Sequence, residues 1–212
     1  MRTRSRWEWH LASDGGRVAL ASLLVALCLA AAAPVASATT VYHTEEEALR
    51  IAFPTATRFD AQPRPLGAEL RDRVSERVGY PIRERLVLIH EASAGGDLVG
   101  RAIVLDEIGK TMPFRFLVAF RPDGAVDEVL LLTYREPRGG EIEREAFRAQ
   151  YAGKTLADPI RRGDDIRNIS GATISVDSLS RGVRRALALQ EALLPPAVAI
   201  KPAEAGEPTA PQ

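Results

Sequence analysis

The residues best suited to chemistry in this 212-residue chain lie in one short segment, Asp165 to Ser175, which reads DIRNISGATIS. Ser170 and Thr173 supply hydroxyls there, and Gly171 and Ala172 between them are small enough to leave room for a bulky group on Thr173. The glycine also permits a backbone turn that other residues resist. Ser170 is a poor candidate for a catalytic nucleophile, because no Gly-x-Ser-x-Gly sequence surrounds it. A hydroxyl that carries a substituent is therefore one possible reading of this segment.

A long helix is predicted directly after this segment, because apolar residues recur at helical spacing from Val176 to Leu194. We expect Ser175 to be its N-cap. The free N–H groups and the dipole at a helix start favour a phosphate, the dipole by roughly 0.3–1 kcal/mol. An ordinary Ser/Thr-rich helix cap without any ligand explains the same residues, and local chemistry alone leaves both readings open.

The elements that position this segment are predicted from apolar runs and turn residues. Two short helices come first, one opened by a capping box at Thr44 and stopped by Pro54, the other over 66–78 with Gly79 as its end signal. Four strands follow, over 86–90, 98–105, 114–120 and 126–134, and a short helix over 143–151. The turns between the strands are short, which favours antiparallel neighbours. The fold class predicted is α+β, an antiparallel β-sheet flanked by helices.

The first 38 residues differ from the rest of the chain. Four arginines precede an aliphatic run over 18–33, and Ala36-Ser37-Ala38 form a small-x-small cleavage pattern. We expect residues 1–38 to be a signal peptide or, alternatively, an uncleaved membrane anchor. Both place the protein outside the cytoplasm, in the periplasm or on the outer face of the cytoplasmic membrane. We expect residues 39–85 to form an N-terminal helical segment, 86–194 the main domain and 195–212 a disordered Pro/Ala-rich tail.

Composition excludes several classes of function. Basic and acidic residues number 28 each, so no basic excess exists to bind nucleic acid. The only cysteine, Cys28, lies in the export segment, which leaves residues 39–212 without thiolate ligands for an iron–sulfur cluster. The two remaining histidines, His43 and His90, are too few for a haem or zinc centre. Gly109-Lys110-Thr111 lacks the preceding glycine of a P-loop. A redox cofactor in this chain would have to be organic.

Ser170-Gly171-Ala172-Thr173 resembles the flavinylation motif of the FMN-binding domain family, which includes the C subunit of the sodium-pumping NADH:quinone oxidoreductase and the G subunit of the Rnf complex. The resemblance extends from about Leu98 to Leu194. Further matching residues lie in Gly109 to Phe120, in Asp123 to Val126, in the loop Tyr134 to Ile142, and in Phe147, Gln150, Tyr151, Gly153 and Lys154. One position departs from the motif, since Arg167 stands where the family usually has aspartate; acids lie nearby at Asp164 and Asp165.

The resemblance implies that FMN is attached through its phosphate to the hydroxyl of Thr173. It implies an ApbE-type transferase, using FAD and magnesium, as the partner that makes the bond. Ser170, Gly171, Ala172 and Ser175 would then surround the phosphate. Glu136, Gly139 and Gly140 would line the flavin ring, and Lys110 and Lys154 would reach the phosphate or the ring carbonyls. For the last five residues a simple solvated position is an open alternative.

Three functions are compatible with this pattern. The first is an exported flavoprotein that relays electrons between membrane or periplasmic redox partner proteins. The second is a flavin-dependent enzyme that acts on a small molecule, and the third is a flavin-free adaptor related to the family. The sequence favours the relay, because the chain shows neither an evident substrate domain nor an acid–base constellation.

Overall fold

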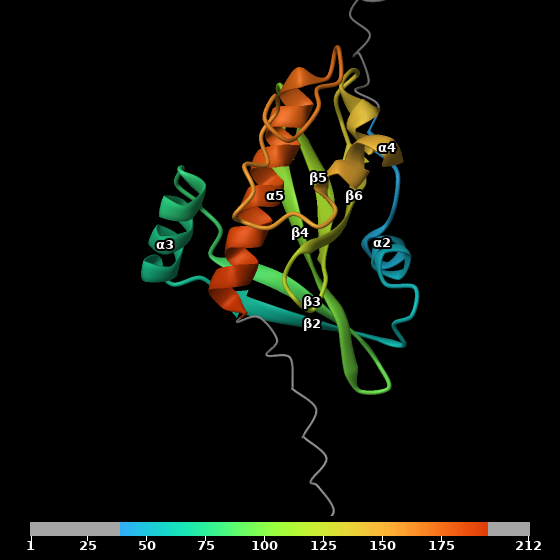
Figure 1. Cartoon of the computed structure of the whole chain (residues 1–212), viewed down its shortest axis with the longest axis vertical. Helices are drawn as coiled ribbons and strands as arrows, with labels where there is room; N and C mark the ends of the chain where they lie inside the picture. Colours follow the sequence, from blue (N-terminus) through green and yellow to red (C-terminus); the bar gives the residue numbers. More distant parts are fainter. Residues whose placement is uncertain (1–38, 195–212) are drawn as a thin grey trace, which may run out of the picture. The chain divides into compact units, whose positions relative to one another are not determined.

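The computed structural model describes residues 39–194, which form a six-stranded antiparallel sheet with helices on both faces (Figure 1). The strand order is β1-β6-β5-β4-β3-β2. The four predicted strands are its centre, where each pairs with its neighbour along the chain: β3 (Leu86–Ala94), β4 (Asp97–Ile108), β5 (Pro113–Phe120) and β6 (Val126–Tyr134). The predicted α+β class is confirmed.

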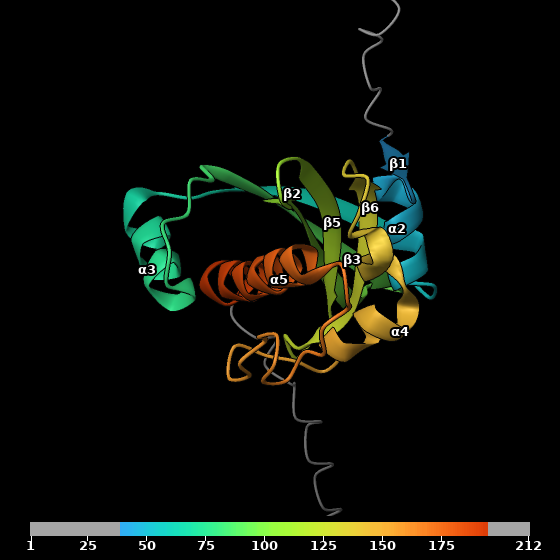
Figure 2. The same ribbon diagram turned by 90° about the horizontal axis from the view of Figure 1, so that it is seen from above.

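Helix α5 (Thr173–Leu193) crosses one face of the sheet together with α3 (Ala68–Val78), and α2 (Glu45–Ala52) covers the other face (Figures 1 and 2). Side chains alternate between the two faces along each strand. On β5 this sends Phe116 and Val118 to the α5 side and Leu117 and Ala119 to the α2 side, all completely buried. The α5 side holds the larger core, and it extends to Phe147 in the short helix α4 (Glu145–Arg148).

Helix ends follow the sequence signals closely in the first half of the domain. Thr44 caps α2 through both bonds of the predicted capping box, its hydroxyl accepting from the Glu47 N–H at 3.2 Å and its N–H donating to the Glu47 carboxylate at 2.8 Å. α3 ends at Gly79, whose φ of +85° is the left-handed conformation that glycine adopts easily. The start of α2 and the end of α3 are therefore set by residues next to them in the chain.

Two strands were not predicted. β1 (Thr40–Val41) pairs with β6 at one edge of the sheet, and β2 (Arg58–Pro65) pairs with β3 at the other. The expectation of a purely helical segment over 39–85 therefore missed both edges of the sheet. Residues 143–151 also form less regular helix than predicted, with α4 set between the 3₁₀ turns η1 (Gly140–Glu143) and η2 (Ala149–Tyr151).

The expected export segment and Pro/Ala-rich tail lie outside the described residues. Within 39–194, no helix is both long and apolar enough to cross a membrane.

Candidate functional site

Thr173 is the first residue of α5, and its side chain is partly exposed. The N-cap is Ala172, and over the described residues no side chain caps this helix start. The prediction that Ser175 is the N-cap is wrong, because the N-cap is three residues earlier, at Ala172. The first backbone N–H groups of a helix have no partner within the helix. The Thr173 hydroxyl thus lies at a helix start whose donors remain available.

The three residues before Thr173 leave space beside it. Ser170 and Gly171 are exposed, and Gly171 adopts φ +85° with open space where a side chain would stand. Ala172 is 2% exposed and turns into the core, which fixes the chain directly before Thr173. A large group on the Thr173 oxygen therefore meets only small or exposed residues on its N-terminal side.

Asn168 makes a contact that the sequence did not suggest. Its side-chain amide donates a hydrogen bond to the Thr173 hydroxyl oxygen at 3.2 Å. The bond uses one lone pair of the oxygen and leaves its hydrogen free, and it orients the side chain of a residue that is already restricted at χ1. Residues five apart across a loop and a helix start show no periodicity, so no sequence signal identifies this pair.

Behind Thr173, Ser175 faces inward and is 4% exposed. Its hydroxyl lies 2.7 Å from that of Tyr134 at the end of β6, and Tyr134 in turn donates to the carbonyl of Arg138 at 2.8 Å. Since a phenol has one hydrogen to donate, Ser175 is the donor to Tyr134. Burial is the main reason that the pKa of Tyr134 is raised, so this hydroxyl stays protonated. The pair fastens the first turn of α5 to the sheet.

The Gly139–Gly140 loop closes over this pair. A side chain at Gly139 would overlap the Ser175 and Tyr134 hydroxyls, and Gly139 also has φ +92°. One at Gly140 would approach the Tyr42 hydroxyl to 3.1 Å. Both glycines are needed for close packing against the start of α5, and so the loop lies at the Thr173 end of the helix. Whether they line a flavin ring stays a prediction.

Glu136 contacts the β4–β5 turn, which also carries Lys110. The Glu136 carboxylate accepts from the backbone N–H groups of Thr111 at 2.7 Å and Met112 at 3.0 Å. Lys110 is exposed on the same turn. Ser178 on α5 donates to the Ile108 carbonyl at 2.7 Å, which ties this turn to the helix one turn beyond Thr173. The structure thus brings the predicted Glu136 and Lys110 to the same end of the domain.

The residues after α4 hold the loop that leads to Thr173. Lys154 forms an ion pair with Asp165 at 2.7 Å, and Asp165 also accepts from the N–H groups of Ile160 and Arg161. Burial opposes ionisation of Asp165, but the hydrogen bonds from Lys154 and the two N–H groups outweigh it and lower its pKa. The Gln150 side chain accepts from the N–H of Arg167 at 2.8 Å. Lys154 is therefore engaged with Asp165 in this structure, and a contact with a cofactor stays a prediction.

Three exposed apolar side chains surround this end of the domain. Ile174 is 48% exposed, Ile108 53% and Met112 36%. Ile174 and Ser178 are four residues apart and share a helix face, and Ser178 contacts the Ile108 carbonyl. Sequence reasoning missed this apolar border, because each residue lies at the edge of an element where burial cannot be read from periodicity.

The described residues contain no group of three or more His, Cys, Asp or Glu side chains placed to hold a metal ion. The site is instead a hydroxyl at an open helix start, with small residues on one side, a glycine loop on another and apolar side chains nearby. This arrangement fits a phosphate ester whose organic part lies over an apolar surface.

Comparison with known proteins finds one matching family and a similar solved structure. The sequence profile of the FMN-binding domain family matches residues 109–188, from the β4–β5 turn to most of α5. Among solved structures, the chain is similar to Shewanella oneidensis NqrC, with 17% sequence identity, a TM-score of 0.45, and coverage of 69% of this chain and 82% of that chain. No curated protein matches the chain significantly.

Proposed function

Since residues 109–188 match the FMN-binding domain family, we propose that this protein is an exported electron-transfer flavoprotein that carries FMN as a phosphoester on Thr173. The observation that carries the proposal is the position of Thr173, a partly exposed hydroxyl on the first residue of an uncapped helix within the described chain. It follows two exposed residues and a buried alanine. A phosphate attached there would lie beside the positive end of a 21-residue helix.

The attachment is a phosphoryl transfer. In the step proposed, a bond forms between the Thr173 oxygen and the phosphorus of the FMN half of FAD, while the bond that joins this phosphorus to the AMP half breaks. AMP leaves and the hydroxyl proton is lost to solvent or to the transferase. Asn168 positions the oxygen for this reaction, and Gly171 keeps the approach open. An ApbE-type transferase with magnesium would supply the catalytic groups.

The bound flavin would supply one- and two-electron chemistry, and the protein would supply position and surroundings. Ile108, Met112 and Ile174 offer exposed apolar area on which the ring can rest. Asp165 and Gln150 hold the loop that leads to Thr173, Asp165 through its ion pair and Gln150 through its hydrogen bond. The residue that carries the flavin therefore has a fixed position. A covalent bond also suits export, since a flavin lost outside the cytoplasm would not be replaced there.

We place the domain on the periplasmic side of the cytoplasmic membrane, free or anchored, with membrane or periplasmic redox proteins as its electron donor and acceptor. The N-terminal sequence pattern supports this placement.

Intact mass spectrometry tests the attachment. The chain is co-expressed with a flavin transferase and purified as wild type, Thr173→Ala, Thr173→Ser and Ser170→Ala. We expect one added FMN-phosphoryl mass in the wild type and in Ser170→Ala, a reduced fraction in Thr173→Ser, and none in Thr173→Ala. Thr173 is partly exposed and makes a single side-chain hydrogen bond, so all variants should unfold within about 0.5 kcal/mol of the wild type.

Covalent flavin that persists in Thr173→Ala would move the site to another residue. A wild type that gains no flavin in a host able to install it would leave the flavin-free adaptor as the better reading.

A further inference from the structure

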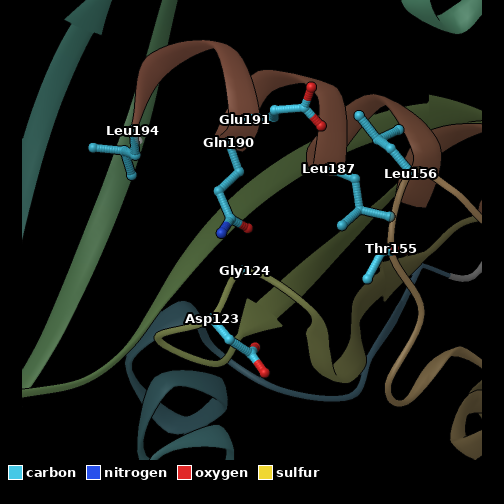
Figure 3. Close-up of a pocket in the computed structure, with 8 residues that line it drawn as sticks. All are labelled: Asp123, Gly124, Thr155, Leu156, Leu187, Gln190, Glu191 and Leu194. Atoms are coloured by element: carbon cyan, nitrogen blue, oxygen red, sulfur yellow. The ribbon is translucent and has the colours of Figure 1, made fainter. Parts of the chain in front are cut away.

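Near the C-terminal end of α5, at the opposite end from Thr173, lies a cavity of about 250 Å³. Figure 3 shows the residues that line it. Gln190 is 17 residues after Thr173, which is about 25 Å along the helix at 1.5 Å per residue. The cavity is therefore separate from the flavin site. Its lining comes from three parts of the chain: the turn before β6, the loop after η2 and the last turns of α5.

The floor of the cavity contains an unsatisfied polar group. Gln190 is 6% exposed and extends from α5 toward Gly124 (Figure 3), and its side-chain oxygen is buried without a hydrogen-bond partner in the described part of the chain. A buried acceptor left unpaired costs about 1–3 kcal/mol. The terminal amide of glutamine rotates easily about its last bond, so the oxygen can turn toward a ligand. This residue indicates a donor that the chain itself does not supply.

The rest of the lining divides into apolar and anionic parts. Leu156, Leu187 and Leu194 provide the apolar part. Asp123 and Glu191 are exposed and stand at the rim. Hydrogen bonding, first from the Ala125 N–H, outweighs a smaller opposing effect of burial and lowers the pKa of Asp123, so this carboxylate is ionised at neutral pH.

Both rim carboxylates keep an oxygen free for a ligand. Arg121 contacts one oxygen of Asp123 at 3.4 Å, and Arg77 contacts one oxygen of Glu191 at 3.7 Å. Thr155, the other polar residue of the lining, donates its hydroxyl to Asp158 at 3.0 Å. Apart from the amide nitrogen of Gln190, the side-chain groups of the lining that stay free are therefore acceptors.

We propose that this cavity binds a small organic cation, a primary ammonium on a short apolar stem. The stem would pack on the three leucines, and the ammonium would donate to the Gln190 oxygen and to the rim carboxylates. The volume equals the liquid share of about eight water molecules, which suits a stem of a few carbons and excludes a nucleotide. An ammonium carries three donors and no acceptor, which matches this lining.

Titration with n-butylammonium chloride tests the proposal on the uniformly ¹⁵N-labelled domain. We expect saturable shifts in the amide resonances of Gly124, Leu156 and Leu187, and none with sodium chloride at equal ionic strength. 1-Butanol has the same stem without the charge, and it should bind at least about fivefold more weakly, since hydrogen bonds to charged groups are the stronger ones. Equal binding of the alcohol, or shifts that do not saturate, would overturn the proposal.

Gln190→Met keeps the length of the side chain and removes the amide. It should weaken n-butylammonium binding about tenfold, and Glu191→Gln should weaken it less, whereas Glu46→Gln on α2 should have no effect. Unfolding midpoints of all variants show whether the fold is kept, and unchanged binding in a folded Gln190→Met would contradict the assignment. Thr173→Ala should bind as the wild type does, so this cavity and the flavin site can fail independently.

Discussion

At its first turn α5 leaves backbone donors and the Thr173 hydroxyl facing outward, whereas near its last turn it buries the amide of Gln190. The donors of the first end lie at the surface, where water satisfies them and an added phosphate can reach them. The second end departs from the rule that buried polar groups find partners, and it does so beside a cavity where only a small molecule fits.

The support behind the two ends also differs. Directly behind Thr173, the buried Ser175–Tyr134 pair and Gly139 hold the helix start to the sheet. At the other end, the N–H of Leu194 donates to the Gln190 carbonyl at 2.8 Å and ends the helix. The side chains of Gln190 and Leu194 there border a cavity. A covalent site needs an exposed atom on a rigid base, while a binding cavity needs space. Four predictions test whether packing really is tighter at the Thr173 end.

The largest effect is expected at Gly139. Gly139→Ala places a methyl group against the Ser175 and Tyr134 hydroxyls in a left-handed backbone conformation, and we expect a loss of about 3 kcal/mol in the free energy of unfolding. Gly171→Ala has a similar φ but open space around it, and should lose about 1 kcal/mol. Urea unfolding measures both. Equal losses would mean that backbone strain alone matters and that the Gly139 contact is unimportant.

A smaller effect is expected from Tyr134→Phe. The change leaves the buried Ser175 hydroxyl and the Arg138 carbonyl without their partner, which should cost about 2 kcal/mol. Tyr80→Phe is the matched control, because the Tyr80 hydroxyl makes a single exposed bond of 3.3 Å to the Arg181 carbonyl. That control should change stability by less than about 0.5 kcal/mol. A Tyr134→Phe protein as stable as this control would remove the pair as an anchor of α5.

Acidification should weaken the contacts of Asp165 that hold the loop before Thr173, and so lower the stability of the protein. The pKa of Asp165 is lower in the folded protein than its ordinary value of 3.8, so its contribution to stability is present above that value and is lost as the pH falls through the folded pKa. We expect the wild type to lose its stability advantage over Asp165→Asn below about pH 4. Unfolding midpoints of both proteins between pH 7 and pH 2.5 measure this. If the difference between the two unfolding midpoints stays constant across that range, the contribution of Asp165 to stability does not depend on its negative charge.

The smallest effect on stability is expected at the far end of the helix. Gln190→Met removes the unsatisfied oxygen and should leave the unfolding free energy within about 0.5 kcal/mol of the wild type, or raise it. Thermal or urea unfolding without added amine measures the difference. A loss above about 2 kcal/mol would mean that the Gln190 amide has a partner within the fold.

Much of the fold follows from local signals. The capping box at Thr44, the left-handed Gly79 and the four apolar strands all appear as predicted, because each depends on residues adjacent in the chain. β2 was missed because Pro63 and Pro65 argue against a strand. Both prolines are tolerated because β2 is an edge strand with a partner on one side only. Residues two apart in a strand point their nitrogen atoms to the same side, which for Pro63 and Pro65 is the side away from β3. Whether a segment with two prolines can form a strand therefore depends on its position in the sheet, which the sequence does not show.

The candidate site divides in the same way. The Ser-Gly-Ala-Thr pattern and the helix after it are enough to predict Thr173 and its small neighbours as the candidate site. The sequence did not reveal that Ser175 faces Tyr134, that Asn168 contacts Thr173, or that Lys154 pairs with Asp165. The Ser175 and Lys154 contacts join residues 41 and 11 positions apart, and the Asn168 contact crosses a loop of irregular shape. The sequence motif singled out the Thr173 hydroxyl as the candidate, and only the tertiary structure decided which residues hold it, because a side chain's partners depend on how distant segments are brought together.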